Sequence, residues 1–114
     1  MSNNADVQMD EVFMRLTPWA ACMITLKAIA DDAQAAGDLY AAAQALDFRL
    51  SGLRLAEHLR DGLIEHPTDA MRDARAQHCR AMSRGRFLAA AHATNRLLKL
   101  VIKTLEQRAS NETT

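Results

Sequence analysis

The chain has 114 residues, 49% hydrophobic and 4% aromatic, and its formal net charge of zero hides a division. Residues 1–66 carry ten acidic and five basic side chains, a net −5, and residues 67–114 carry four acidic and nine basic ones, a net +5. This length allows one domain with one core, and abundant alanine and leucine beside few strand-forming residues exclude a sheet protein and predict an all-α fold.

The start of the chain is polar, and its first helical pattern is short. Residues 1–8 are predicted to be disordered, and the folded domain is expected to span residues 9–108. A short amphipathic helix is predicted where four apolar residues recur at helical spacing, namely Met9, Val12, Phe13 and Leu16.

A helix from Pro18 to about Ala36 has clear signals at both ends. Thr17 suits the N-cap, Pro18 suits the first helical position, and Gly37 suits the C-terminal cap. At 100° per residue, the apolar residues of this segment share one side, which predicts the face that packs into the core. These residues are Trp19, Cys22, Met23, Leu26, Ile29, Ala30 and Ala33.

Residues 39–65 predict one long helix, capped by Asp38, that is apolar on two sides. A helix with two apolar sides needs two partners, so it is either the central helix of the bundle or a helix that meets another subunit. Ser51-Gly52 leaves open a break into two shorter helices. The first side carries Leu39, Ala43, Leu46, Leu50 and Leu53. The second carries Ala41, Ala45, Phe48, Leu55, Leu59 and Leu63.

Two basic helices are predicted in the second half of the chain, after a turn and cap at residues 67–69. The helix over residues 69–83 is arginine-rich, with a weak apolar side of Met71, Ala74, His78, Ala81 and Met82. Gly85 separates it from a helix over residues 87–108, and residues 109–114 form a polar tail that is predicted to be disordered. The core face of this last helix carries Phe87, Ala90, Ala91, Thr94, Leu98, Val101 and Leu105.

The opposite face of helix 87–108 is a basic stripe of His92, Arg96, Lys99 and Lys103. Such a stripe either binds an anionic partner, which is a phosphate backbone or an acidic protein surface, or is an ordinary solvated helix face. The zero net charge of the chain and the lack of an aromatic pair on which bases would stack favour the solvated face or a protein partner over DNA.

Candidate metal ligands and reactive groups are few. Glu57, Asp61 and Glu65 share a face of the predicted long helix, but no Glu-x-x-His pair accompanies them, so neither a metal nor a cofactor is predicted. Cys22 and Cys79 lie far apart in the sequence, which indicates reduced thiols and a cytoplasmic protein. No apolar run approaches the roughly 20 residues of a membrane span, and the acidic N-terminus is unlike a secretory signal.

Arg72 and His78 are separated by five residues, a spacing that resembles the Arg-x(4–6)-His motif of HEPN-type helical ribonucleases. The resemblance implies an RNA-cleaving enzyme in which His78 is the base or proton donor and Arg72 stabilises the phosphate. The motif covers seven residues, and the pairs Arg60…His66 and Arg86…His92 have the same spacing, so its specificity is low.

The sequence therefore predicts an all-α bundle of four or five helices that is dimeric through the doubly apolar helix 39–65. The predicted function is non-enzymatic: a small regulator or adaptor of a bacterial-type cytoplasm, such as an inhibitor, an anti-activator of transcription or a chaperone. It would bind a partner protein, and a second copy of itself, through Phe48, Leu55, Leu59 and Leu63. Nucleic-acid binding through helices 69–84 and 87–108 is the alternative, and a HEPN-like ribonuclease is the second alternative.

Overall fold

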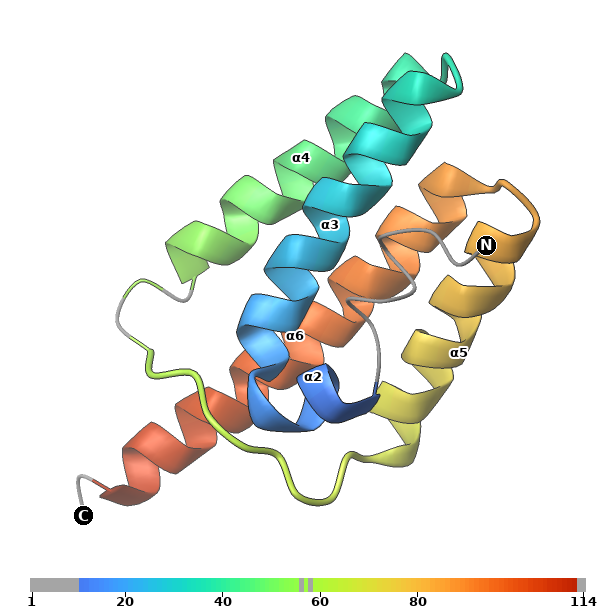
Figure 1. Ribbon diagram of the computed structural model, residues 1–114. Coiled ribbons are helices and arrows are strands. Elements are labelled where there is room, and N and C mark those ends of the chain that lie inside the picture. The colour runs from blue at the N-terminus through green and yellow to red at the C-terminus, as the bar shows by residue number, and fades with distance from the viewer. Residues whose placement is uncertain (1–10, 56, 58, 113–114) are drawn as a thin grey trace.

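The computed structural model describes residues 11–55, 57 and 59–112, and all regular structure in this part of the chain is helical. The predicted all-α bundle is therefore confirmed, whereas residues 1–8 lie outside the described part. None of the described helices combines the length and apolarity that a membrane crossing needs. In chain order the helices are α2 Glu11–Leu16, α3 Pro18–Ala35, α4 Leu39–Leu55, α5 Asp69–Ser83 and α6 Phe87–Glu112 (Figure 1).

The bundle consists of two antiparallel hairpins, α3 with α4 and α5 with α6, and the central helices are α3 and α6 (Figure 1). α3 contacts α2, α4 and α6, while α6 contacts α3, α4 and α5. α4 is thus not the central helix, which was one of the two alternatives that its two apolar sides left open. It packs against α3 and α6 with one side, and its other side faces outward.

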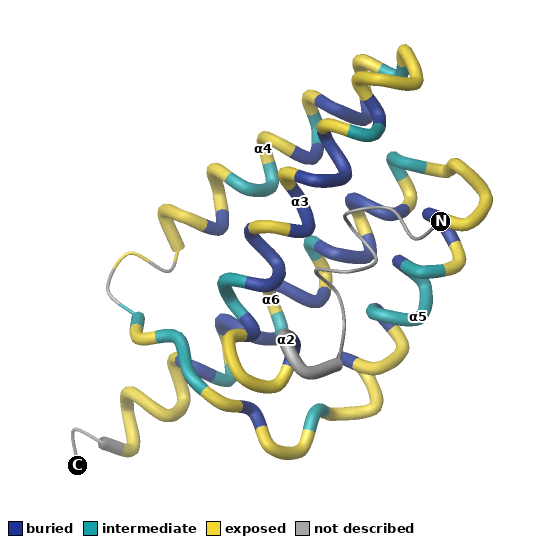
Figure 2. Tube along the Cα trace, in the orientation of Figure 1, coloured by how far each residue is buried: buried dark blue, intermediate teal, exposed yellow. Residues whose placement is uncertain are grey.

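The core lies between these helices and follows the predicted faces closely. Every residue predicted to face the core from α3, α5 and α6 is buried or half-buried. In Figure 2 the buried positions gather on the facing sides of α3 and α6. Near the α3–α4 turn the packing is dominated by alanine, which lets the helix backbones approach closely: Ala28, Ala30, Ala33, Ala41, Ala42, Ala45, Ala90 and Ala91.

The turn between α3 and α4 forms as predicted. Gly37 has a φ of +82°, a left-handed conformation that glycine adopts without strain, and its N–H donates to the carbonyl oxygen of Gln34 (3.0 Å). Asp38 then caps α4, because its carboxylate accepts a hydrogen bond from the Ala41 N–H (3.1 Å).

The boundaries of α5 also agree with the prediction, while α6 is longer than predicted. The Thr68 hydroxyl oxygen accepts from the Met71 N–H (3.2 Å), and Gly85, with a φ of +67°, separates the two helices. α6 continues to Glu112 instead of ending near Arg108. No glycine or proline lies between its ends, so no residue in it stops the helix.

The cap of α3 comes from a different residue than the one predicted. α3 begins at Pro18 as expected, but no capping hydrogen bond comes from the Thr17 side chain. The carboxylate of Asp61 takes this role, accepting from the Trp19 N–H (3.0 Å) and the Ala20 N–H (3.0 Å). A negative charge there also suits the positive end of the helix dipole.

The prediction of one long helix over residues 39–65 is wrong, because α4 ends at Leu55. Gly52 lies inside α4, so the chain does not break at that glycine either. Residues 59–68 instead form an irregular segment that connects the end of α4 to α5 past the base of α2 (Figure 1).

Tertiary contacts explain why this segment is not helical. Besides the cap made by Asp61, Ile64 is buried and its N–H donates to the carbonyl oxygen of Arg15 (2.7 Å), and Leu59 packs against the core. A helix through residue 65 would satisfy local propensity, but it would give up these contacts.

Candidate protein-binding surfaces

The outward side of α4 is an apolar stripe made of Leu39, Ala43, Leu46, Leu50 and Leu53, called the leucine face below. All five side chains are exposed, and the leucines keep 66%, 42%, 53% and 37% of their surface in solvent. Their spacing of four, three, four and three residues is the heptad spacing with which one helix packs along another. The leucine face therefore has the pattern of a helix-packing surface, but no described helix covers it.

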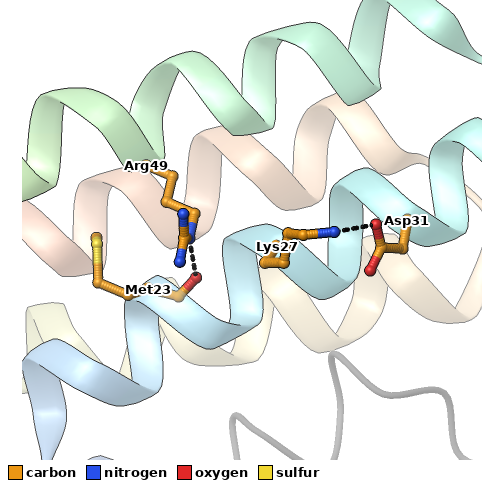
Figure 3. Close-up of polar contacts among 4 residues, drawn as sticks. All are labelled: Met23, Lys27, Asp31 and Arg49. Atoms are coloured by element: carbon orange, nitrogen blue, oxygen red, sulfur yellow. Dashed lines mark hydrogen bonds and ion pairs between the residues drawn. The ribbon is translucent and has the colours of Figure 1, made fainter.

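The inner side of α4 explains why the leucines face outward. Ala41, Ala45 and Gly52 are buried against α3 and α6, on the opposite side of the helix from the leucine face. Arg49 flanks the leucine face and donates from Nε to the carbonyl oxygen of Met23 on α3 (3.3 Å; Figure 3). These contacts fix the rotation of α4 about its axis.

The four residues predicted as the interface do not form one helix stripe. Phe48 is half-buried and packs against the core, and Leu59 does so from the irregular segment. Leu55 and Leu63 are exposed, at the end of α4 and in the irregular segment respectively. The prediction assumed a helix through residue 65. Both sides of α4 have residues at intervals of four and three, so spacing alone did not distinguish them. The small residues Ala41, Ala45 and Gly52 mark the side that packs closely against its neighbours.

The basic stripe on α6 is arranged as predicted. His92, Arg96, Lys99 and Lys103 are all exposed on one side of the helix, between α4 and α5. Arg96 donates from Nη2 to the side-chain oxygen of Gln77 on α5 (2.7 Å). The His92 ring meets the Phe48 ring edge-on, with centroids 5.1 Å apart.

A pocket of about 170 Å³ between α4 and α6 brings the two predicted sets of residues together. Phe48 and Leu55 from the predicted interface line it from α4, and Lys99 from the basic stripe lines it from α6. The same pocket is also lined by Asp47, Ser51, Gly52, Asn95, Leu98 and Ile102. Apolar and basic groups therefore meet at one surface of the molecule, called the α4–α6 groove below.

The Arg72–His78 pair does not form a surface site. His78 has no exposed surface, and burial together with the nearby positive charge of Arg75 lowers the pKa of its imidazole to about 4. Arg72 is exposed and pairs with Asp69 (3.1 Å) one turn earlier on α5. A buried neutral imidazole cannot reach an RNA phosphate, so this geometry gives no support to the ribonuclease alternative.

The candidate thiol and carboxylate ligands do not come together in one site either. Burial, followed by the negative charge of Asp61, raises the pKa of the Cys22 thiol, so this cysteine is an inert core residue. Asp61 is used as the α3 cap, while Glu57 and Glu65 are exposed. Among the described residues no three histidine, cysteine or carboxylate side chains are close enough to hold a metal ion.

The ion pairs between described side chains are local. The ion pairs that described side chains form with one another are Lys27–Asp31 (2.6 Å; Figure 3) and Arg72–Asp69, and each stays within one helix. Neither connects the acidic half of the chain to the basic half. The basic stripe is accordingly left without a described carboxylate partner.

Compared with protein-family models, with characterised proteins and with solved structures, the chain matches none. Function is therefore inferred from the two surfaces described above, the leucine face of α4 and the α4–α6 groove.

Proposed function

We propose that the protein is a non-enzymatic protein-binding module, a small regulator or adaptor whose contact surface is the leucine face of α4. The observation that carries this proposal is the exposed heptad row Leu39, Ala43, Leu46, Leu50 and Leu53. Of the nine large hydrophobic side chains exposed in the described part of the chain, six are on α4. Exposed apolar side chains that are scattered singly over a protein surface are common, whereas a group of them on one helix indicates a contact surface.

The chemistry of the leucine face favours a helical partner. Heptad spacing presents side chains to a facing helix, and Ala43 in the middle of the row allows close approach. Covering four half-exposed leucines contributes about 1 kcal/mol each, which is small beside the roughly 4–15 kcal/mol that association costs. A partner must therefore add contacts of its own, as a second copy of α4 with its own leucines would.

The test is a double charge substitution, Leu46→Asp with Leu50→Asp. We expect the wild-type protein to self-associate in sedimentation velocity, or to retain a partner from its native lysate, and the variant to lose that interaction. Leu16→Asp with Leu63→Asp is the matched control, because it places the same charges on exposed leucines elsewhere. Equal association of both double variants, with unchanged helical circular dichroism, contradicts the proposal.

Nucleic-acid binding is the second candidate, favoured by the exposed basic stripe of α6. A phosphate backbone would be held by charge alone there, so binding to duplex DNA should weaken steeply between about 50 and 200 mM salt. Lys99→Glu with Lys103→Glu should abolish such binding, as measured by fluorescence anisotropy. An absence of DNA binding at the lower salt excludes this candidate.

A further inference from the structure

The α4–α6 groove combines a pocket that has several apolar walls with basic side chains that form no ion pair with a described side chain. We propose that it is a second binding site, which takes an acidic amphipathic helix of a partner protein. One bulky apolar side chain of that helix enters the pocket, and its carboxylates face Lys99 and Lys103. This site lies beside the leucine face and does not depend on it.

The size of the pocket indicates what enters it. At about 170 Å³ it is too small for a drug-sized ligand, whose pockets are roughly 300–1,000 Å³. A dry apolar cavity of about 150 Å³ is large enough for benzene, so this pocket suits a single leucine or aromatic side chain. Phe48, Leu98 and Ile102 supply apolar walls for such a group.

The charges beside the pocket indicate which polar groups accompany that side chain. The basic stripe extends along α6 from His92 to Lys103, a distance of roughly 16 Å at 1.5 Å per residue. Lys99 and Lys103 form no ion pair with a described side chain, so they can pair with carboxylates from outside. Carboxylates three or four residues apart on a helix match their spacing of one turn.

The two rims of the pocket differ in charge, which sets the orientation of the bound helix. Lys99 lies on the α6 rim, whereas Asp47 lies on the α4 rim. A helix with carboxylates on one side only would turn that side toward α6 and keep it away from Asp47. Electrostatic complementarity of this kind favours specificity and rapid association.

These features favour an acidic helix over a nucleic acid. A nucleic acid carries charge along its whole length and would place phosphates near Asp47. Phe48 is the aromatic residue that lines this pocket, and it is half-buried beside His92, so the groove lacks the row of exposed aromatic rings on which successive bases would stack. Arg72 and Arg75 of α5 lie elsewhere, because they line a different pocket beside Met14.

The test uses synthetic helical peptides of about 16 residues, long enough to span the basic stripe. The first peptide carries leucines spaced three and four residues apart with glutamates beside them. The second replaces the glutamates with lysines, the third replaces the leucines with alanines, and a single-stranded oligonucleotide is the fourth probe. Binding is measured by fluorescence anisotropy, and we expect the first peptide alone to bind at about 150 mM salt.

Variants of the full chain assign the site. Lys99→Glu with Lys103→Glu should weaken binding of the first peptide by about tenfold or more. Ser51→Phe, at an exposed position on the pocket wall, should weaken it without changing any charge. Arg84→Glu with Arg86→Glu is the matched control, because it makes the same change in net charge at exposed positions outside the groove, and it should leave binding intact.

Several outcomes overturn the proposal. Equal binding of the alanine peptide would show that the pocket is not used, and tighter binding of the oligonucleotide would identify the stripe as a nucleic-acid site. Equal loss in the control variant would show non-specific attraction, and binding of none of the probes at about 100 μM would show that the groove is not a site. Self-association that Lys99→Glu with Lys103→Glu abolishes would make a second copy the occupant.

The outcome is independent of the proposed function. Leu46→Ser with Leu50→Ser removes apolar surface from the leucine face without adding charge beside the pocket, so it should leave peptide binding unchanged. If the peptide fails to bind, the proposal for the leucine face still stands. If the leucine-face test fails, the proposal for the α4–α6 groove still stands.

Discussion

His78 is the residue for which folding changes protonation in the clearest way. Its imidazole is fully buried, and Nε2 has no hydrogen-bond partner among the described residues. Burial, with a contribution from the charge of Arg75, lowers its pKa from an ordinary 6.5 to about 4. As pH falls from about 6.5 to about 4, the unfolded chain gains a proton that the folded chain excludes, so stability is lost over that window. The full shift corresponds to about 3 kcal/mol.

Replacing His78 with leucine should remove this pH dependence. We expect His78→Leu to lose about 2 kcal/mol less stability than the wild type between pH 6.5 and pH 4.5, because an apolar side chain has no proton to gain. Urea unfolding at a series of pH values measures the difference. His66→Gln is the control, since His66 is exposed in the irregular segment. Parallel pH profiles for the wild type and His78→Leu would refute this account.

Asp61 shows how a single side chain can connect parts of the chain that are distant in sequence. It accepts hydrogen bonds from the Trp19 and Ala20 N–H groups, 42 and 41 residues earlier. Asp61→Ala should therefore destabilise the protein by about 1–2 kcal/mol, the usual cost of removing a helix cap. Urea unfolding followed by the fluorescence of Trp19 measures this. Glu65→Ala, an exposed carboxylate nearby, should have little effect, and equal losses would contradict the capping role.

At the level of the helix, Gly52 sets how closely α4 approaches its neighbours. A Cβ atom at this position would lie 2.5 Å from Met23 Cε and 2.6 Å from Leu98 Cδ2, both closer than van der Waals contact allows. Both atoms are ends of flexible side chains that must shift, and the γ-methyl groups of valine need further space, so Gly52→Val should destabilise the protein by about 1–3 kcal/mol through overpacking. Ser51→Val makes the same substitution on the exposed side of the helix and controls for helix propensity. Similar urea midpoints for the two variants would show that the interface relaxes around the side chain.

Local signals predicted α3, α5 and the start of α6 well, whereas the end of α4 was predicted wrongly for an identifiable reason. Thr68, Gly85 and the Pro18 start mark their ends within a few residues, so α3, α5 and the beginning of α6 follow from caps and periodicity. The end of α4 does not follow from local signals. Residues 59–64 make contacts with α2, α3 and the core, and these contacts are seen only in the tertiary structure. The predicted interface inherited that error, whereas the basic stripe, contained within one regular helix, was placed correctly.

At the scale of the whole molecule, the division of charge between the two halves is a property of the surface and not of the packing. The ion pairs among described side chains are local, and each is exposed, so each contributes little to stability. The helices are instead held by apolar contacts between α3, α4, α5 and α6. Lys99 and Lys103, which form no ion pair with a described side chain, are accordingly available for contacts with other molecules.

This arrangement predicts that salt has little effect on folding while it affects binding. We expect the free energy of unfolding in urea to change by less than about 1 kcal/mol between roughly 20 and 500 mM sodium chloride, because added ions screen only exposed pairs. Binding of an acidic peptide at the α4–α6 groove should weaken over the same range, since Lys99 and Lys103 contribute through their charge. If the halves were held together by ion pairs, salt would lower the urea midpoint markedly. Comparing unfolding and peptide titrations on the same samples distinguishes the two cases.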